Sequence, residues 1–169
     1  MYISPINLVQ GLIDILEMNE ESISQVLVHY LGDLQGKPEL NIFKGMRKTL
    51  PLSAFPCIEF EPTSGSNEWT TTSAQTGEYS IQCTLTVNCD NDDLGAEYIS
   101  ELTRRIIEIY TYPGNMCFKI PNEYQDSQKT PVYVQFGTIS NVTYNATKDG
   151  TLRVSQWDWT GRVLEVFPY

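Results

Sequence analysis

The sequence predicts an α+β fold, in which an antiparallel or mixed β-sheet is flanked by helices within a single domain over residues 1–169. Three observations predict it. Apolar residues recur at helical spacing near the N-terminus, apolar and polar residues alternate from Tyr79 to Cys89, and Asp149-Gly150 separates two long strand-like runs. The expected element order is α-α-β-β-β-α-β-β. Since most neighbouring strands lack a helical crossover between them, antiparallel pairing should dominate.

Two helices are expected over residues 5–31. Ser4 and Pro5 are typical of a helix start, as N-cap and first helical residue. Gly32 is suited to end the second helix, because glycine is favoured just past a helix C-terminus. The apolar positions that define the two helices are Ile6, Val9, Ile13 and Leu16, then Ile23, Val26, Leu27, Tyr30 and Leu31.

The sheet and its covering helix are expected over residues 39–167. Short strands are predicted at 39–44 and 55–61, and a longer one at 79–89, where alternation implies one buried and one polar face. Residues 62–76 are rich in Ser, Thr, Gly and Asn, so they predict a long exposed loop or a hairpin extension.

A third helix should follow, capped by Asp92 or Asp93. A short strand is possible at 116–120, and two long strands are predicted at 132–144 and 151–167. The apolar parity of the last strand changes twice, which indicates either two bulges or a strand that exchanges buried faces.

The net charge limits the classes of partner. The chain has 11 basic and 21 acidic residues, a formal charge of −10. Such a surface repels nucleic-acid phosphates and anionic membranes, so tight binding to either is not expected. The first apolar stretch follows no basic residue and contains Asp14, so neither a signal peptide nor a membrane span is predicted.

The residues that could support catalysis or metal binding do not form a known pattern. The four cysteines show no CxxC spacing, and His29 is the only histidine, so no metal, cofactor or enzymatic activity is expected. Asp90, Asp92 and Asp93 lack the Gly and Glu of a calcium loop. Glu59 and Glu61 share a strand face and leave a small hydrolase as a weak alternative.

Large aromatic residues in polar surroundings suggest a protein interface instead. Trp69 lies in the polar 62–76 segment, and Trp157 and Trp159 share a face of the last strand, where core packing is an equal alternative. A second polar connection covers about 121–131. The candidate interface residues are Glu68, Trp69, Thr70, Tyr124, Gln125, Trp157 and Trp159.

The order and lengths of the elements resemble those of bacteriophage tail-terminator and head–tail joining (neck) proteins. Three features carry the resemblance: the strand Phe55-Pro56-Cys57-Ile58-Glu59-Phe60, the alternating strand Tyr79 to Cys89 leading into a helix with Leu102-Thr103-Arg104-Arg105-Ile106-Ile107, and a terminal hairpin. The hairpin runs from Phe136-Gly137-Thr138-Ile139 to Trp157-Asp158-Trp159 and Val163-Leu164-Glu165-Val166.

The resemblance implies a structural virion protein, assembled in the host cytoplasm, that forms a homo-oligomeric ring, commonly a hexamer. Such a ring caps the tail tube and joins it to neck or connector proteins, and in a contractile tail it can also contact the sheath. DNA would pass through the lumen without tight binding, because like charges remove the counterion-release contribution to affinity.

Two other functions remain open at this point. One is a head–tail connector, tail-completion or collar protein of the neck. The other belongs to a different class, a β-rich carbohydrate-binding module whose tryptophans stack on sugar rings.

Overall fold

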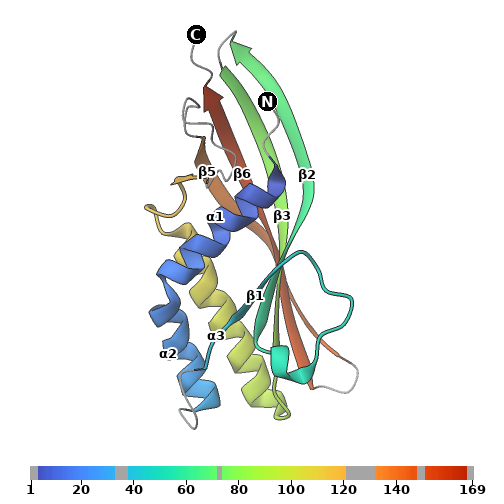
Figure 1. Ribbon diagram of the computed structural model, residues 1–169. Helices are drawn as coiled ribbons and strands as arrows, with labels where there is room; N and C mark the ends of the chain where they lie inside the picture. Colours follow the sequence, from blue (N-terminus) through green and yellow to red (C-terminus); the bar gives the residue numbers. More distant parts are fainter. Residues whose placement is uncertain (1–3, 33–37, 72–73, 121–131, 148–150, 167–169) are drawn as a thin grey trace.

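The computed structural model describes residues 4–32, 38–71, 74–120, 132–147 and 151–166. It confirms the α+β fold, with three helices packed on one side of a single sheet (Figure 1). Helix α1 spans Pro5–Met18, α2 Glu20–Leu31 and α3 Asp92–Thr111. Among the described residues, no helix is both long enough and apolar enough to span a membrane.

The predicted helix boundaries are largely confirmed. Ser4 occupies the N-cap of α1, although its side chain makes no capping hydrogen bond, and α2 ends at Gly32 with a positive φ of 75°. The predicted cap of α3 was wrong. Asn91 is the N-cap, and its side-chain oxygen accepts a hydrogen bond from the Leu94 N–H at 2.9 Å. Asp92 and Asp93 therefore lie in the first turn, where their negative charge interacts favourably with the positive end of the helix dipole.

Six strands form one mixed sheet in the order β1-β2-β3-β6-β5-β4. Only β1 and β2 are parallel; the other neighbours are antiparallel. The short strand left open by the sequence is present as β4, which lengthens the predicted element order by one. The bounds are β1 Asn41–Lys44, β2 Cys57–Thr71, β3 Ala74–Asn88, β4 Phe118–Lys119, β5 Tyr133–Ala146 and β6 Leu152–Val166, with a 3-10 turn η1 at Leu52–Ala54.

The polar segment 62–76 adopts the hairpin alternative rather than the loop. Strands β2 and β3 continue through it in antiparallel register, from Pro62↔Ile81 to Thr71↔Ala74. The end of this hairpin extends beyond the helices in Figure 1. Because no helix covers that end, its polar composition is compatible with a strand, and composition alone did not distinguish the two structures.

The parity changes of the last strand do not arise from bulges in that strand. β6 pairs continuously with β3 from Leu152 to Val166, so its apolar residues occupy both faces of the sheet. The irregularities lie in its other neighbour, β5, at Val134/Phe136 and Ser140/Thr143. The buried face itself does not change: Ser155, Trp157, Trp159 and Val163 are buried on one face, while Leu152, Val154 and Leu164 are half-buried on the other. The structure therefore supports neither alternative.

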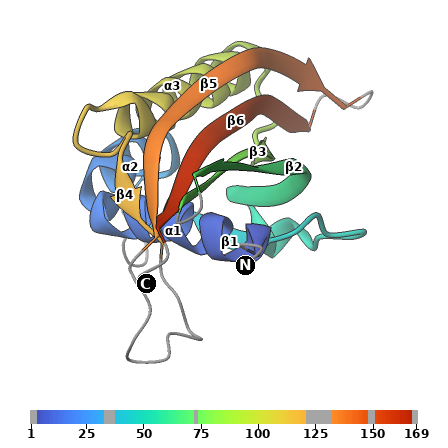
Figure 2. The same ribbon diagram turned by 90° about the horizontal axis from the view of Figure 1, so that it is seen from above.

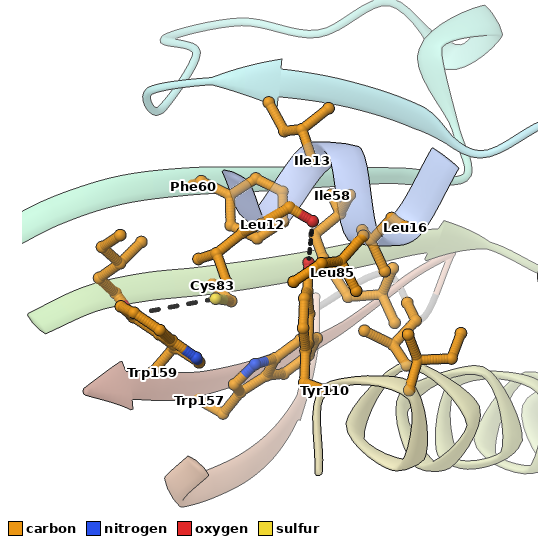
Figure 3. Packing of buried hydrophobic residues seen from close by; sticks show 14 of the residues in the cluster. Leu12, Ile13, Leu16, Ile58, Phe60, Cys83, Leu85, Tyr110, Trp157 and Trp159 are labelled. Atoms are coloured by element: carbon orange, nitrogen blue, oxygen red, sulfur yellow. Dashed lines mark hydrogen bonds between the residues drawn. The ribbon is translucent and has the colours of Figure 1, made fainter. Parts of the chain in front are cut away.

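The core lies between the helices and one face of the sheet, with side chains from α1, β2, β3, α3 and β6 (Figure 3). The alternating residues of β3 are fully buried from Tyr79 to Val87, which confirms the predicted buried face. Tyr110 on α3 donates a hydrogen bond to the Leu12 carbonyl at 3.0 Å and thereby links two helices inside the core. Its hydroxyl is satisfied by this bond, as a buried polar group requires.

Candidate assembly surfaces

The first candidate surface is the end of the β2–β3 hairpin. Glu68, Trp69 and Thr70 are all exposed there, and 59% of the Trp69 surface is accessible to solvent. Glu68 and Trp69 pair with Thr76 and Gln75 on β3, so a regular two-stranded ribbon positions them. A large exposed aromatic on an ordered strand can anchor a protein interface at a low entropic cost.

The other predicted interface tryptophans belong to the core. Trp157 and Trp159 are 1% and 2% exposed, and they pair with Cys83 and Ile81 on the helix-covered face of the sheet (Figure 3). Their proposed interface role in this fold is therefore wrong, because the protomer itself buries both rings. The carbohydrate-binding alternative loses the same two aromatics and retains only Trp69.

Tyr124 and Gln125 lie outside the described residues. Their role as interface residues stays a prediction from the sequence.

The face of the sheet opposite the helices is polar. Strand pairing aligns side chains of β2, β3 and β6 across this face. One such row is Glu59–Thr84–Gln156, and the next row contains Asp158. Gln156 donates from Nε2 to Thr84 Oγ1 at 3.2 Å, which links β6 to β3 through side chains. On β2, β3 and β6, strand register places on this face the carboxylates of Glu59, Glu61, Glu68, Glu78 and Asp158 and a single cation, Arg162. Glu68 and Glu78 are exposed on this face, Glu61 and Asp158 are half-buried, and Glu59 is buried, so the face is polar with an excess of acidic groups.

Glu59 and Glu61 hold the turn that follows β1. Glu59 accepts a hydrogen bond from the Arg47 N–H at 2.5 Å, and Glu61 accepts one from the Met46 N–H at 2.9 Å. Both carboxylates thus bind backbone donors of the same chain, and Glu59 is only 4% exposed. This arrangement assigns them a structural role and gives no support to the hydrolase alternative.

Strand β5 forms a surface that the sequence reasoning missed. Tyr133, Phe136, Val142 and Tyr144 are between 39% and 52% exposed along it. Among the described residues, β4 pairs with β5 only at Val134 and Tyr133, so the rest of that edge has no neighbouring strand there. The sequence contained an indication of this surface. Between residues 132 and 144, apolar residues occur at both odd and even positions, whereas a strand with one buried face needs them at only one of the two. An apolar edge strand of this kind is a typical site of association.

The acidic and sulfur-containing groups do not form a metal centre within the described ranges. Asp92, which was considered for calcium, instead accepts a hydrogen bond from Arg153 at 3.0 Å. Cys57 and Cys83 are buried free thiols, and burial raises the pKa of Cys57 to about 12 and that of Cys83 further above its usual range. Both behave as small core residues, as the sequence indicated, whereas Cys117 is exposed.

Comparison with solved structures finds chains of similar structure. No protein-family model matches the chain, and no curated protein matches it. A chain from a solved structure described as "Virion of native gene transfer agent (GTA) particle" aligns with a TM-score of 0.44 and 7% sequence identity. The alignment covers 87% of this chain and 96% of that one.

Proposed function

We propose that this chain is a structural virion subunit that forms a ring, with six copies as the expected number, on the end of a phage-like tail tube. In this role it terminates the tube and joins it to neck proteins. The element order that resembles tail terminators supports the proposal, together with the arrangement of surfaces on the protomer.

The observation that carries the proposal is the two-faced sheet. One face packs on α1 and α3, and the other carries Glu68, Glu78 and Asp158 with a single cation, Arg162, on β2, β3 and β6, outside the part where Glu59 and Glu61 bind the turn after β1. A ring that turns this polar face toward its axis has an acidic lumen. Double-stranded DNA crosses such a lumen without tight binding, because the phosphates meet like charge and release no counterions.

Ring closure also needs two different patches that meet between neighbouring copies. The hairpin end with Trp69 and the β5 edge with its exposed aromatics lie on different elements and can serve separate contacts. In our proposal the hairpin end, which extends past the helices, contacts the tail tube or a neck protein (Figure 1). A contractile tail would add the sheath as a further partner.

The test is the native mass of the protein, alone and with isolated tail tubes. Size-exclusion chromatography with light scattering should detect a closed oligomer, or binding of an oligomer to the end of tubes, and electron microscopy should show a ring there. Monomer at every concentration, with no tube binding, would refute the proposal. Recovery with heads, and absence from tails that lack heads, would favour the connector or collar role instead.

A further inference from the structure

A groove on the protomer combines an apolar floor with an acidic rim. It lies between the α1–α2 junction and residues 38–42 and has a volume of about 550 Å³. Leu16, Ile23 and Leu27 contribute buried apolar side chains to its walls. Its exposed carboxylates come from Glu17, Glu20, Glu21 and Glu39. Within the described part of the chain, none of the four is in an ion pair.

A loop on the same protomer has the complementary character. Its three exposed cations are Lys44 at the end of β1 and Arg47 and Lys48 on the turn that follows. They are the densest group of cations in the sequence. Two exposed apolar side chains accompany them, Met46 at 46% and Leu52 at 68%. The described carboxylates form no ion pair with these cations either.

The loop has a defined shape before any partner binds. Hydrogen bonds from the Met46 and Arg47 N–H groups to the β2 carboxylates hold its first residues. The Arg47 guanidinium lies 5.1 Å from the centre of the Phe43 ring, within the range of a cation–π contact. A preformed loop loses less conformational entropy on binding than a flexible one.

The groove and the loop of one copy do not face each other. In Figure 1 α2 lies to the left of β1 and the loop projects to its right, and Figure 2 shows the same separation from above. Among the described residues no ion pair joins the two groups of charges, so they remain available to pair between two chains in a head-to-tail contact. Such a contact is heterologous, the type that closes into rings.

Three other arginines in the described ranges have partners within the protomer. Arg104 is bound by two glutamates of α3, Arg105 by Ser22 and Gln25, and Arg153 by Asp92. Among the described residues, the cations of the loop are thus a basic cluster without an ion pair in the protomer, and they can bind carboxylates of another molecule.

We propose that residues 44–52 of one copy dock in the 38–42 groove of the next copy. The cations of the loop pair with the carboxylates of the rim, and Met46 or Leu52 covers the apolar floor. This contact names one subunit interface of the proposed ring and so rests on that proposed function. Complementary charge accelerates encounter and fixes the register of the two copies, while the apolar contact adds affinity.

The test uses charge reversal and recombination. The loop variant carries K44E, R47E and K48E, and the groove variant carries E17K, E20K and E39K. Each variant alone should self-associate at least ~10-fold more weakly than wild type at low salt, with a smaller difference at high salt. Circular dichroism checks that both remain folded. The controls are single changes on α3, outside the two surfaces, R104A and E97K, which should assemble as wild type does.

An equimolar mixture of the two variants is the decisive measurement. In the mixture an acidic loop meets a basic groove and a basic loop meets an acidic groove, so association should return, with the two variants alternating in a 1:1 ratio by native mass spectrometry. Wild-type-like assembly of both single variants, or no recovery in the mixture, would overturn the docking proposal while the ring stands. Loss of assembly in the groove variant alone would assign the groove to a basic segment of another protein and likewise overturn it. A wild-type chain that forms no oligomer, even on tail tubes, would instead refute the ring itself.

Discussion

An alanine at Gly161 should destabilise the protein through a single aromatic ring. Gly161 on β6 pairs with Gly137 on β5, and the indole of Trp159 lies across both. A Cβ added at Gly161 would lie 2.0 Å from Trp159 Cη2 and 2.6 Å from Cζ3, whereas one at Gly137 would lie 2.7 Å from Nε1. These separations are far below the contact distance of about 3.5–4 Å between carbon atoms.

The expected magnitude follows from how little the ring can move. Trp159 is 2% exposed, with the Phe118 ring 6.0 Å away between centroids, so a shift of about 1.5 Å would have to propagate into the core. Overpacking of this kind costs about 1–3 kcal/mol. The lower chain entropy of alanine returns at most about 1 kcal/mol. We therefore expect Gly161→Ala to lower the free energy of unfolding by about 2 kcal/mol.

Urea unfolding followed by circular dichroism measures this change. Gly65→Ala is the matched control, since Gly65 is an exposed strand glycine with ordinary φ, and its effect should stay within about 0.5 kcal/mol. Trp159→Phe removes the ring atoms nearest the added methyl, so Gly161→Ala should cost much less in that background. Equal costs in both backgrounds, or no cost in the wild type, would refute the reasoning.

Four further outcomes are expected. Trp69→Ala should change stability by less than about 1 kcal/mol, since the ring is mostly exposed, yet weaken binding to isolated tail tubes in co-sedimentation. At pH 8 a thiol reagent should label Cys117 quickly and the buried Cys57 and Cys83 only on unfolding; equal rates would contradict their burial. Burial raises the folded-state pKa of Cys57 from 9.0 to about 12, so the neutral thiol contributes its full stability below pH 9, and this contribution is lost as the pH rises from about 9 to 12. Urea unfolding of wild type and Cys57→Ala at increasing pH should therefore show a difference in the free energy of unfolding that becomes smaller above pH 9. Arg104→Ala should leave the melting temperature almost unchanged, because its ion pairs with α3 glutamates are exposed.

The predictions that succeeded depended on strong local periodicity. The alternation from Tyr79 to Cys89 identified β3 and its buried face, and the Ser4-Pro5 start located α1. Backbone geometry and side-chain patterns agreed in these segments, so little tertiary information was needed.

The predictions that stayed open or failed depended on tertiary context. A polar strand in a projecting ribbon and a polar loop have the same composition, so residues 62–76 could not be assigned to one of them. Trp157 and Trp159 could face either a partner or the protein's own helices, and only the packing of α3 and α1 on that face decided. The capping role of Asn91 rather than its aspartate neighbours depended on a single hydrogen bond.

The groove was equally invisible in the sequence, because its walls come from helices and from the segment before β1, which only the fold brings together. The same limit applies to β5, because only the fold shows that, in the part of the chain that the structure describes, β4 pairs with just two of its residues.

The position of β3 also bears on how the molecule is made. Its two neighbours are β2, which immediately precedes it, and β6, which follows only after α3, β4 and β5. During synthesis the β2–β3 hairpin can form early, while the other edge of β3 stays unsatisfied until β6 has left the ribosome. Ribosome-bound chains that end before residue 152 should therefore recruit chaperones, and the folded protomer that assembles can form only after β6 has been synthesised.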